Sequence, residues 1–232
     1  MLFMAPGVMV PSAWSHDLIT AEAVEKYLSR ADADLAAVRG KSAARVRAEA
    51  HYDLGRMLDE IRELLNRDVA MHGRVQGLPT HLLLKELKGR GLELAAGAGS
   101  GRYPVPSAHY VEALKLDADA HGGDAAFRLL TGRFYDSFDA DPARSRLSWP
   151  ELEEQMRLAE RLASRKPSHP EQEEIEFVAA VLHVQAAALV PDRTRAADHV
   201  KRAQTAAAVF SRRYPDSLRN AALEVLTAAS KP

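Results

Sequence analysis

The stretch AAVFSRRYPDS at residues 207–217, followed by NAA at residues 220–222, carries the pattern that decides the fold. The alanine-rich sequence before Tyr214 favours a helix. Because proline disfavours the α conformation in the residue before it, that helix is expected to end at Tyr214-Pro215. Asp216 or Ser217 can cap a helix that follows. The stretch therefore predicts two helices joined by a tight break.

The same order of helix, break and helix occurs three times in the second half of the chain. An anchor residue follows each break, and the anchors Phe127, Phe177 and Val225 are 50 and then 48 residues apart. A repeated unit of this kind indicates stacked helical hairpins, because a single amphipathic hairpin cannot bury its own apolar face. We therefore expect the three anchors, together with Phe210, to lie in the core between hairpins.

The composition independently favours an all-α fold. Hydrophobic residues make up 47% of the 232 residues and aromatic residues only 6%, and the chain is rich in alanine and other good helix formers. The net charge of −1 argues against a nucleic-acid partner, which a basic surface would meet. The sequence also contains no polybasic segment that would attract a membrane surface.

Caps and apolar spacing place the helices along the chain. Thr20 is a plausible N-cap and Gly40 a stop, so the first two helices form an N-terminal hairpin within residues 16–72. Residues 73–107, with Gly73, Gly77 and Pro79, are expected to be an irregular linker that contains one helix. Residues 108–232 hold the repeats. The expected helices span residues 20–38, 42–71, 80–94, 108–116, 122–138, 149–165, 170–190, 193–213 and 217–230.

Residues 207–217 and 220–222 resemble the tetratricopeptide-like (TPR-like) repeats of bacterial envelope proteins. In those repeats an Ala, a Phe, Tyr-Pro-Asp-Ser and a new Ala-rich helix follow one another, and residues 162–170, LASRKPSHP, are similar to a weaker copy. The resemblance covers about residues 108–230 and implies an α-solenoid of stacked antiparallel hairpins. Tetratricopeptide repeats are about 34 residues long, so steps of 50 and 48 residues imply longer helices or loops.

Residues 1–15, MLFMAPGVMVPSAWS, contain no charged side chain and end in small residues. An apolar run before such residues is typical of a signal peptide, although the positive n-region is missing. We expect export to a periplasm or the cell surface, or a cytoplasmic protein if residues 1–15 are an apolar arm packed on the body. Because the chain has no cysteine to carry a lipid, the processed protein is expected not to insert in a membrane.

The nine histidines do not show the usual spacing of helical metal ligands, since no two are four residues apart. We therefore expect no cofactor and no metal. One speculative exception is His16, which would become the N-terminus if cleavage followed Ser15. Its amine and imidazole could then bind copper with a second histidine.

The segment GRFYDSFDADP at residues 132–142 is the densest cluster of aromatic and acidic side chains. Aromatic rings beside charges can form a recognition surface, whereas the carboxylates could act as an acid and base pair, as in glycosidases. A helix end with a buried aromatic face and solvated acids is the third interpretation. The candidates for partner binding are Arg133, Tyr135, Asp136, Asp139, Tyr103 and Tyr110.

These observations favour a non-enzymatic, exported helical-repeat protein. We expect it to act as an interaction or assembly module that holds an extended peptide or helix of another envelope protein. A periplasmic copper or small-ligand binder that uses His16 is the second hypothesis, and an envelope enzyme with carboxylates near Asp136 is the third.

Overall fold

The computed structural model describes residues 18–97, 101–137, 146–165 and 171–229. Within these ranges the chain forms nine α-helices and one short 3₁₀ helix, and no strand. The expected all-α fold is therefore confirmed. The helices are α1 (Ala21–Arg39), α2 (Ala44–His72), α3 (Leu78–Gly89), α4 (Ser107–Leu116), η1 (Ala120–Gly123), α5 (Asp124–Ser137), α6 (Trp149–Ala163), α7 (Gln172–Leu189), α8 (Arg193–Arg213) and α9 (Arg219–Ala229).

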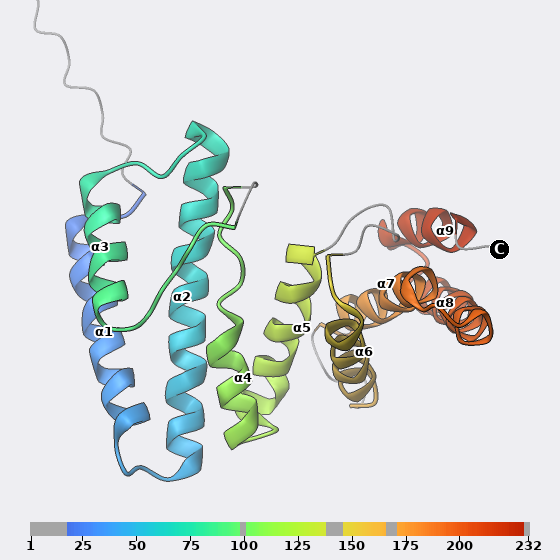
Figure 1. Ribbon diagram of the computed structural model, residues 1–232, viewed down its shortest axis with the longest axis horizontal. Coiled ribbons are helices and arrows are strands. Elements are labelled where there is room, and N and C mark those ends of the chain that lie inside the picture. The colour runs from blue at the N-terminus through green and yellow to red at the C-terminus, as the bar shows by residue number, and fades with distance from the viewer. Residues whose placement is uncertain (1–17, 98–100, 138–145, 166–170, 230–232) are drawn as a thin grey trace, which may run out of the picture.

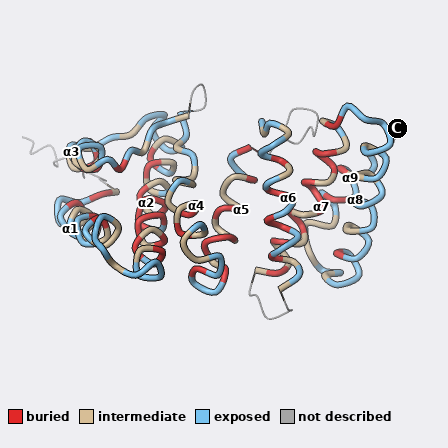
Figure 2. Tube along the Cα trace, turned by 60° about the horizontal axis from the view of Figure 1, so that its bottom comes forward, coloured by how far each residue is buried: buried red, intermediate tan, exposed pale blue. Residues whose placement is uncertain are grey.

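The helices follow one another along the long axis of the molecule in chain order, with α3 returning beside α1 (Figures 1 and 2). Consecutive helices pack on each other from α4 to α9. Buried residues lie between the successive helices, and both outer sides are exposed (Figure 2). This packing of consecutive helices is compatible with a solenoid.

Local signals begin and end the helices close to where they were expected. The hydroxyl of Thr20 accepts the N–H of Ala23, as an N-cap does. Ser148 and Glu151 form a capping box at the start of α6. The carboxylate of Asp192 accepts two backbone N–H groups at the start of α8. The start of α2 differs, because Ala43 rather than Ser42 precedes the helix and no side chain caps it.

Helices α1, α2 and α3 enclose an aliphatic core. Leu54, Ile61 and Leu65 of α2 share this core with Leu83 and Leu87 of α3, and all five are almost fully buried. The helix inside the expected linker therefore belongs to this N-terminal core. Burying each of these leucines contributes roughly 1.5–3 kcal/mol.

Residues 101–106, which we call the strap, lead into α4 and have contacts with α2 and α5. The side-chain amide of Asn66 donates to the carbonyl of Tyr103 and accepts its N–H, at 2.9 and 2.7 Å. The N–H of Val105 donates to Asp136 Oδ2 on α5 at 2.5 Å. The strap is thus fixed to α2 on one side and to α5 on the other.

Helices α4 to α9 share a second core in which alanines and aromatic rings are added to leucines and valines. Phe134 of α5, Phe177 of α7 and Phe210 of α8 lie in a line, with 6.3 Å between successive ring centroids. Phe177 and Phe210 are buried as expected, and Phe127 is half-buried against the same core. The small side chains of the alanines let the helices approach closely, and the rings fill the space that remains between them.

The expectation that Val225 is a core anchor was wrong. Its side chain is 69% exposed, whereas Leu223 and Leu226 of the same helix are buried in the second core. Residues three apart share one helix face, and Val225 lies on a different face. A spacing of 48 residues locates the helix but does not select the residue that faces inward.

Two glycines allow close approach, one between α2 and α4 and the other between α5 and the strap. A Cβ on Gly55 of α2 would lie 2.8 Å from Cε1 of Tyr110, so the ring of α4 rests on this glycine. A Cβ on Gly132 of α5 would lie 2.6 Å from Cγ2 of Val105 in the strap. These contacts join α2 to α4, and the strap to α5.

Candidate functional site

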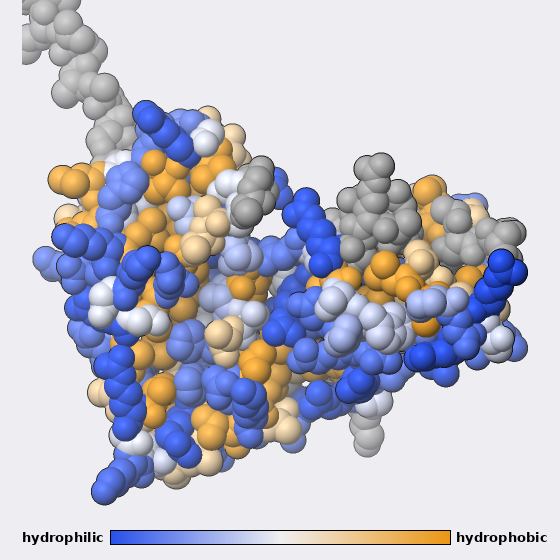
Figure 3. Space-filling model, viewed as in Figure 1, coloured by the Kyte–Doolittle hydropathy of each residue, from blue (hydrophilic) through white to orange (hydrophobic). Residues whose placement is uncertain are grey.

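A cleft of about 530 Å³ opens between α2, the strap, α5 and the first turns of α7 and α9. We call it the α5 cleft. Its charged lining consists of Asp59, Arg62, Glu63, Asp124, Arg128, Glu171, Glu173, Glu174 and Arg219, and Val105, Phe127, Thr131, Gly132 and Tyr135 complete it. In the view of Figure 3, hydrophilic side chains gather where the surface is hollowed between the N-terminal helices and α6–α9.

Negative charge predominates in the α5 cleft. Six carboxylates and three guanidinium groups line it, which gives a formal charge of −3. The protein as a whole carries only −1. A concave surface lined mainly by charges of one sign raises the local concentration of oppositely charged groups of a partner.

One set of ion pairs fixes the wall formed by α2 and α5. Asp59, which is 8% exposed, pairs with Nε of Arg62 at 2.6 Å and with Arg128 of α5 at 3.8 Å. Arg128 also pairs with Asp124 at 2.9 Å, and Asp124 accepts the hydroxyl of Tyr52. Burial and the hydrogen bond to Asp124 raise the pKa of Tyr52. These contacts hold α5 against α2.

A second set fixes the opposite wall. Arg219 at the start of α9 pairs with Glu173 and Glu174 of α7, and its guanidinium lies 5.3 Å from the ring centroid of Phe177. The hydroxyl of Tyr135 donates to Glu174. Partial burial, followed by the carboxylate of Glu174, raises the pKa of Tyr135 to about 12. The ring of Tyr135 nevertheless stays 52% exposed and faces the cleft.

The predicted candidates on α5 divide between this cleft and structural contacts. Tyr135 lines the cleft, whereas Arg133 pairs with Glu154 of α6 at 3.3 Å. Asp136 accepts the N–H of Val105, and its partial burial raises the pKa of its carboxyl group. Asp139 lies outside the described residues.

The two predicted tyrosines of the N-terminal half have different environments. Tyr110 was proposed as a partner contact, but it is fully buried against Gly55 and cannot reach a partner. Its pKa is raised by burial. Tyr103 lines a separate pocket of about 780 Å³ between the end of α2, α3 and the strap. The copper candidate His16 lies outside the described residues.

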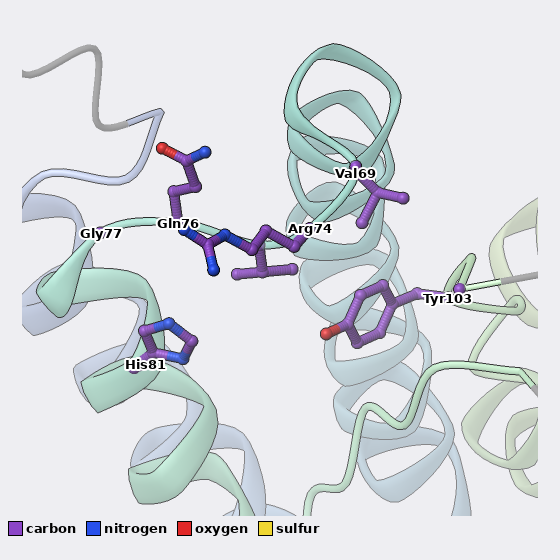
Figure 4. A pocket seen from close by; sticks show the side chains of 9 residues that line it. Val69, Arg74, Gln76, Gly77, His81 and Tyr103 are labelled. Carbon is purple, nitrogen blue, oxygen red and sulfur yellow. The ribbon is translucent and has the colours of Figure 1, made fainter.

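This second pocket, the α3 pocket, is formed mainly by the loop at residues 73–77. The side chains of Arg74 in that loop, His81 of α3 and Tyr103 of the strap lie around it (Figure 4). The loop is held by Asp68, which accepts the N–H of Gln76 at 2.5 Å. Among the described residues, Arg74 is the one arginine of the α3 pocket and no carboxylate lines it, so it offers fewer charged contacts than the α5 cleft.

Residues that sequence reasoning missed form most of the α5 cleft. Asp59 and Arg62 come from α2, Asp124 and Arg128 from the start of α5, and Arg219 from α9. Each of these residues lies on a helix whose charged side chains show no unusual spacing in the sequence. The only local signal was the density of aromatic and acidic residues around Tyr135.

No family model, no curated protein and no solved structure matches this chain. None of the helices in the described ranges combines the length and the apolar content needed to cross a membrane. In the same part of the chain, no three histidine or acidic side chains converge as metal ligands. The geometry and charge of the α5 cleft are therefore the observations that bear on function.

Proposed function

We propose that the protein is a non-enzymatic binding module whose α5 cleft receives a positively charged segment of a partner protein. The observation that carries this proposal is the excess of six carboxylates over three guanidinium groups in one cleft. Each of the three arginines is already paired with a carboxylate of the cleft, and the formal charge of the lining is −3. A lysine or arginine of the partner would meet that charge.

The aromatic side chains of the cleft suit the same kind of ligand. Tyr135 is exposed and Phe127 is half-buried, and both line the cleft. A cation over an aromatic face gains about 0.5–1 kcal/mol at exposed sites. A ring next to carboxylates therefore favours an arginine or lysine side chain over an acidic or purely apolar one.

The rigidity of the walls also supports binding. Asp59 and Arg128 hold α5 to α2, and Arg219 holds α9 to α7. A preorganised cleft spends less free energy on ordering its own side chains when a ligand binds. The TPR-like arrangement expected for residues 108–232 would present such a cleft to an extended peptide or helix.

The alternative of an envelope enzyme with carboxylates near Asp136 has weaker support. A general acid needs a free carboxyl group with a raised pKa. The pKa of Asp136 is raised, but its Oδ2 accepts the N–H of Val105 and holds the strap. This carboxylate therefore has a structural task that a reacting substrate would disrupt.

We also propose that the partner belongs to the cell envelope, because residues 1–15 have the features of a signal peptide. The intact mass of the protein isolated from its native host tests this part. A mass that lacks residues 1–15 would support export. A mass that retains them would place the partner in the cytoplasm and would also exclude copper binding by a terminal His16.

Binding of designed peptides tests the charge preference of the α5 cleft. Fluorescein-labelled peptides of alternating lysine and alanine are compared with matched peptides of alternating glutamate and alanine, by fluorescence anisotropy. The lysine peptide should bind, more weakly as salt is raised, because screening reduces exposed charge interactions. The glutamate peptide should not bind.

A pair of charge reversals assigns the binding to the cleft. Glu63 lines the cleft and is exposed, and its contact with Arg62 is long at 3.8 Å. Glu63→Lys should lower the affinity for the lysine peptide by about tenfold, which corresponds to about 1.4 kcal/mol. Glu25→Lys on the exposed surface of α1 makes the same change of net charge and should alter the affinity less than about twofold. Equal effects of the two variants would overturn the proposal.

A further inference from the structure

Two pairs of histidines face each other across helix junctions with the same geometry. Nδ1 of His51 on α2 lies 3.2 Å from Nδ1 of His109 on α4, and the same distance separates His183 on α7 from His199 on α8. The ring centroids are 5.4 and 5.5 Å apart, with interplanar angles of 37° and 33°. All four rings are half-buried.

Two imidazole nitrogens at this distance need a proton or a cation between them. In the neutral pair, one Nδ1–H donates to the lone pair of the other Nδ1. If both rings carry their proton on Nε2, two lone pairs converge instead. Zn–N bonds of about 2.0–2.1 Å at a tetrahedral angle place two nitrogen ligands about 3.3 Å apart. The observed 3.2 Å therefore fits one edge of a tetrahedral zinc site.

The rings of the first pair are available as neutral ligands. Burial, and then the neighbouring His51, lowers the pKa of His109 to about 4. Burial also lowers the pKa of His51. A metal ion at this junction would not have to displace a proton from a charged ring near neutral pH.

The charged residue that acts on both rings differs in sign between the two pairs. Glu112 lies three residues after His109, hence on the same face of α4, and its charge acts on both rings of the first pair. Its carboxylate pairs with Lys115 at 2.6 Å and is exposed. Arg47 on α2 opposes this effect at His51.

At the second pair, Arg202 lies three residues after His199 and acts on both rings, and Arg195 adds a second positive charge. Asp198 and Glu153 offset part of this charge at His199. The edge of the pair is also covered by Trp149, whose ring centroid is 6.1 Å from that of His199. The chain thus holds two matched histidine pairs, with a glutamate beside one and an arginine beside the other.

We propose that His51 and His109 form a binding site for a divalent transition-metal ion of the zinc class, favoured by the charge of Glu112, and that His183 and His199 do not bind one. The site supplies two protein nitrogens and leaves its remaining positions to water or to an outside ligand. A bound ion bridges α2 and α4. It therefore links the helix shared by both cores to the first helix of the C-terminal stack.

Titration of the full chain with Zn²⁺ by isothermal calorimetry tests the site. The wild-type protein should bind one equivalent through this junction. His109→Asn should weaken binding by about tenfold or more, while His199→Asn should leave it unchanged. Loss of binding with His199→Asn, or retention with the double variant His51→Asn/His109→Asn, would overturn the assignment.

Changing the charged residue three positions after His109 or after His199 alters the charge beside the pair and leaves the histidines in place. Glu112→Gln should weaken binding by about tenfold. Arg202→Glu should give a second equivalent of zinc at the α7–α8 junction, because the geometry there already matches. A stoichiometry that stays at one with Arg202→Glu would show that the neighbouring charge does not decide which pair binds.

Stability provides an independent readout for variants that fold less well. A ligand that binds only the native state raises the midpoint of thermal unfolding as its concentration rises. Zn²⁺ should raise the midpoint of the wild type and of His199→Asn, and should not raise that of His109→Asn. The same rise in all three proteins would contradict the proposal.

Discussion

The two cores of the molecule are built from different side chains. Between α1, α2 and α3 the buried side chains are aliphatic, with leucines in the majority. Between α4 and α9 the buried leucines and valines are joined by alanines and by a line of aromatic rings, in which Phe134, Phe177 and Phe210 lie in successive contact. The first core spreads its packing over many similar aliphatic contacts, whereas the second adds a few large rings that each fill much of the space between helices. The second core also carries the walls of the α5 cleft.

The largest effect should follow from removing one ring of this line. Phe210 is fully buried and contacts Phe177 and Tyr214. Phe210→Ala should reduce the free energy of unfolding by about 4 kcal/mol, because the packed neighbours collapse only partly into the cavity. Urea denaturation followed by circular dichroism measures the loss. Val209→Ala, at an exposed neighbour, should cost less than about 0.5 kcal/mol. Similar losses for the two variants would contradict this view of the second core.

The next effect concerns the contact that joins α2 to α4. Gly55→Ala places a methyl group 2.8 Å from the ring of Tyr110, which is buried and cannot move aside. Overpacking costs about 1–3 kcal/mol, and the better helix propensity of alanine returns about 1 kcal/mol. We expect a net loss of up to about 2 kcal/mol in urea denaturation.

Gly89 in α3 is the matched control for Gly55. A Cβ there meets no atom within 4 Å. Gly89→Ala should therefore stabilise the protein by about 0.5 kcal/mol through helix propensity alone. If both glycine variants changed stability in the same direction, the close contact at Gly55 would not be the cause.

A smaller effect should appear on acidification. Burial, and then His199, lowers the pKa of His183 from 6.5 to about 4 in the folded protein. Between these values the unfolded chain binds the proton first, so stability is complete above about pH 6.5 and falls as the pH approaches 4. Partial exposure limits the loss to about 1–2 kcal/mol. Denaturation curves measured from pH 7 to pH 4 should be flatter for His183→Asn than for the wild type, and equal slopes would argue against a buried neutral pair.

The smallest effect tests the corrected anchor of α9. Val225 is exposed, so Val225→Ala should change the free energy of unfolding by less than about 0.5 kcal/mol. Leu223→Ala in the same helix should cost about 2–3 kcal/mol, because Leu223 is buried in the second core. The reverse order in urea denaturation would restore Val225 as the anchor.

The sequence predicted the helices well because their signals are local. Thr20, the glycine at residue 40 and the Tyr214-Pro215 break act on the residues next to them, and the expected span 193–213 matches α8. Which side of α9 faces the core was not predictable in the same way. Whether Val225 or Leu223 is buried depends on where α7 and α8 lie, and a repeat spacing carries no such information.

The candidate site depended on long-range packing and was predicted only in part. Tyr135 was identified from its local composition, but its partner Glu174 and the facing Asp59 come from distant helices. The histidine pair His51 and His109 is separated by 58 residues along the chain, so a search for ligands spaced by one helical turn could not find it.

The location of a bound cationic peptide tests the central claim most directly. The lysine peptide is made with one photoreactive benzoylphenylalanine, irradiated in complex with the full chain, and the cross-linked residues are mapped by mass spectrometry. The account predicts cross-links on α5 and on the first turns of α7 and α9, around Tyr135 and Arg219. Cross-links confined to the α3 pocket around Arg74 and Tyr103, or to the groove that Ser211 of α8 and Glu224 of α9 line, would contradict this claim.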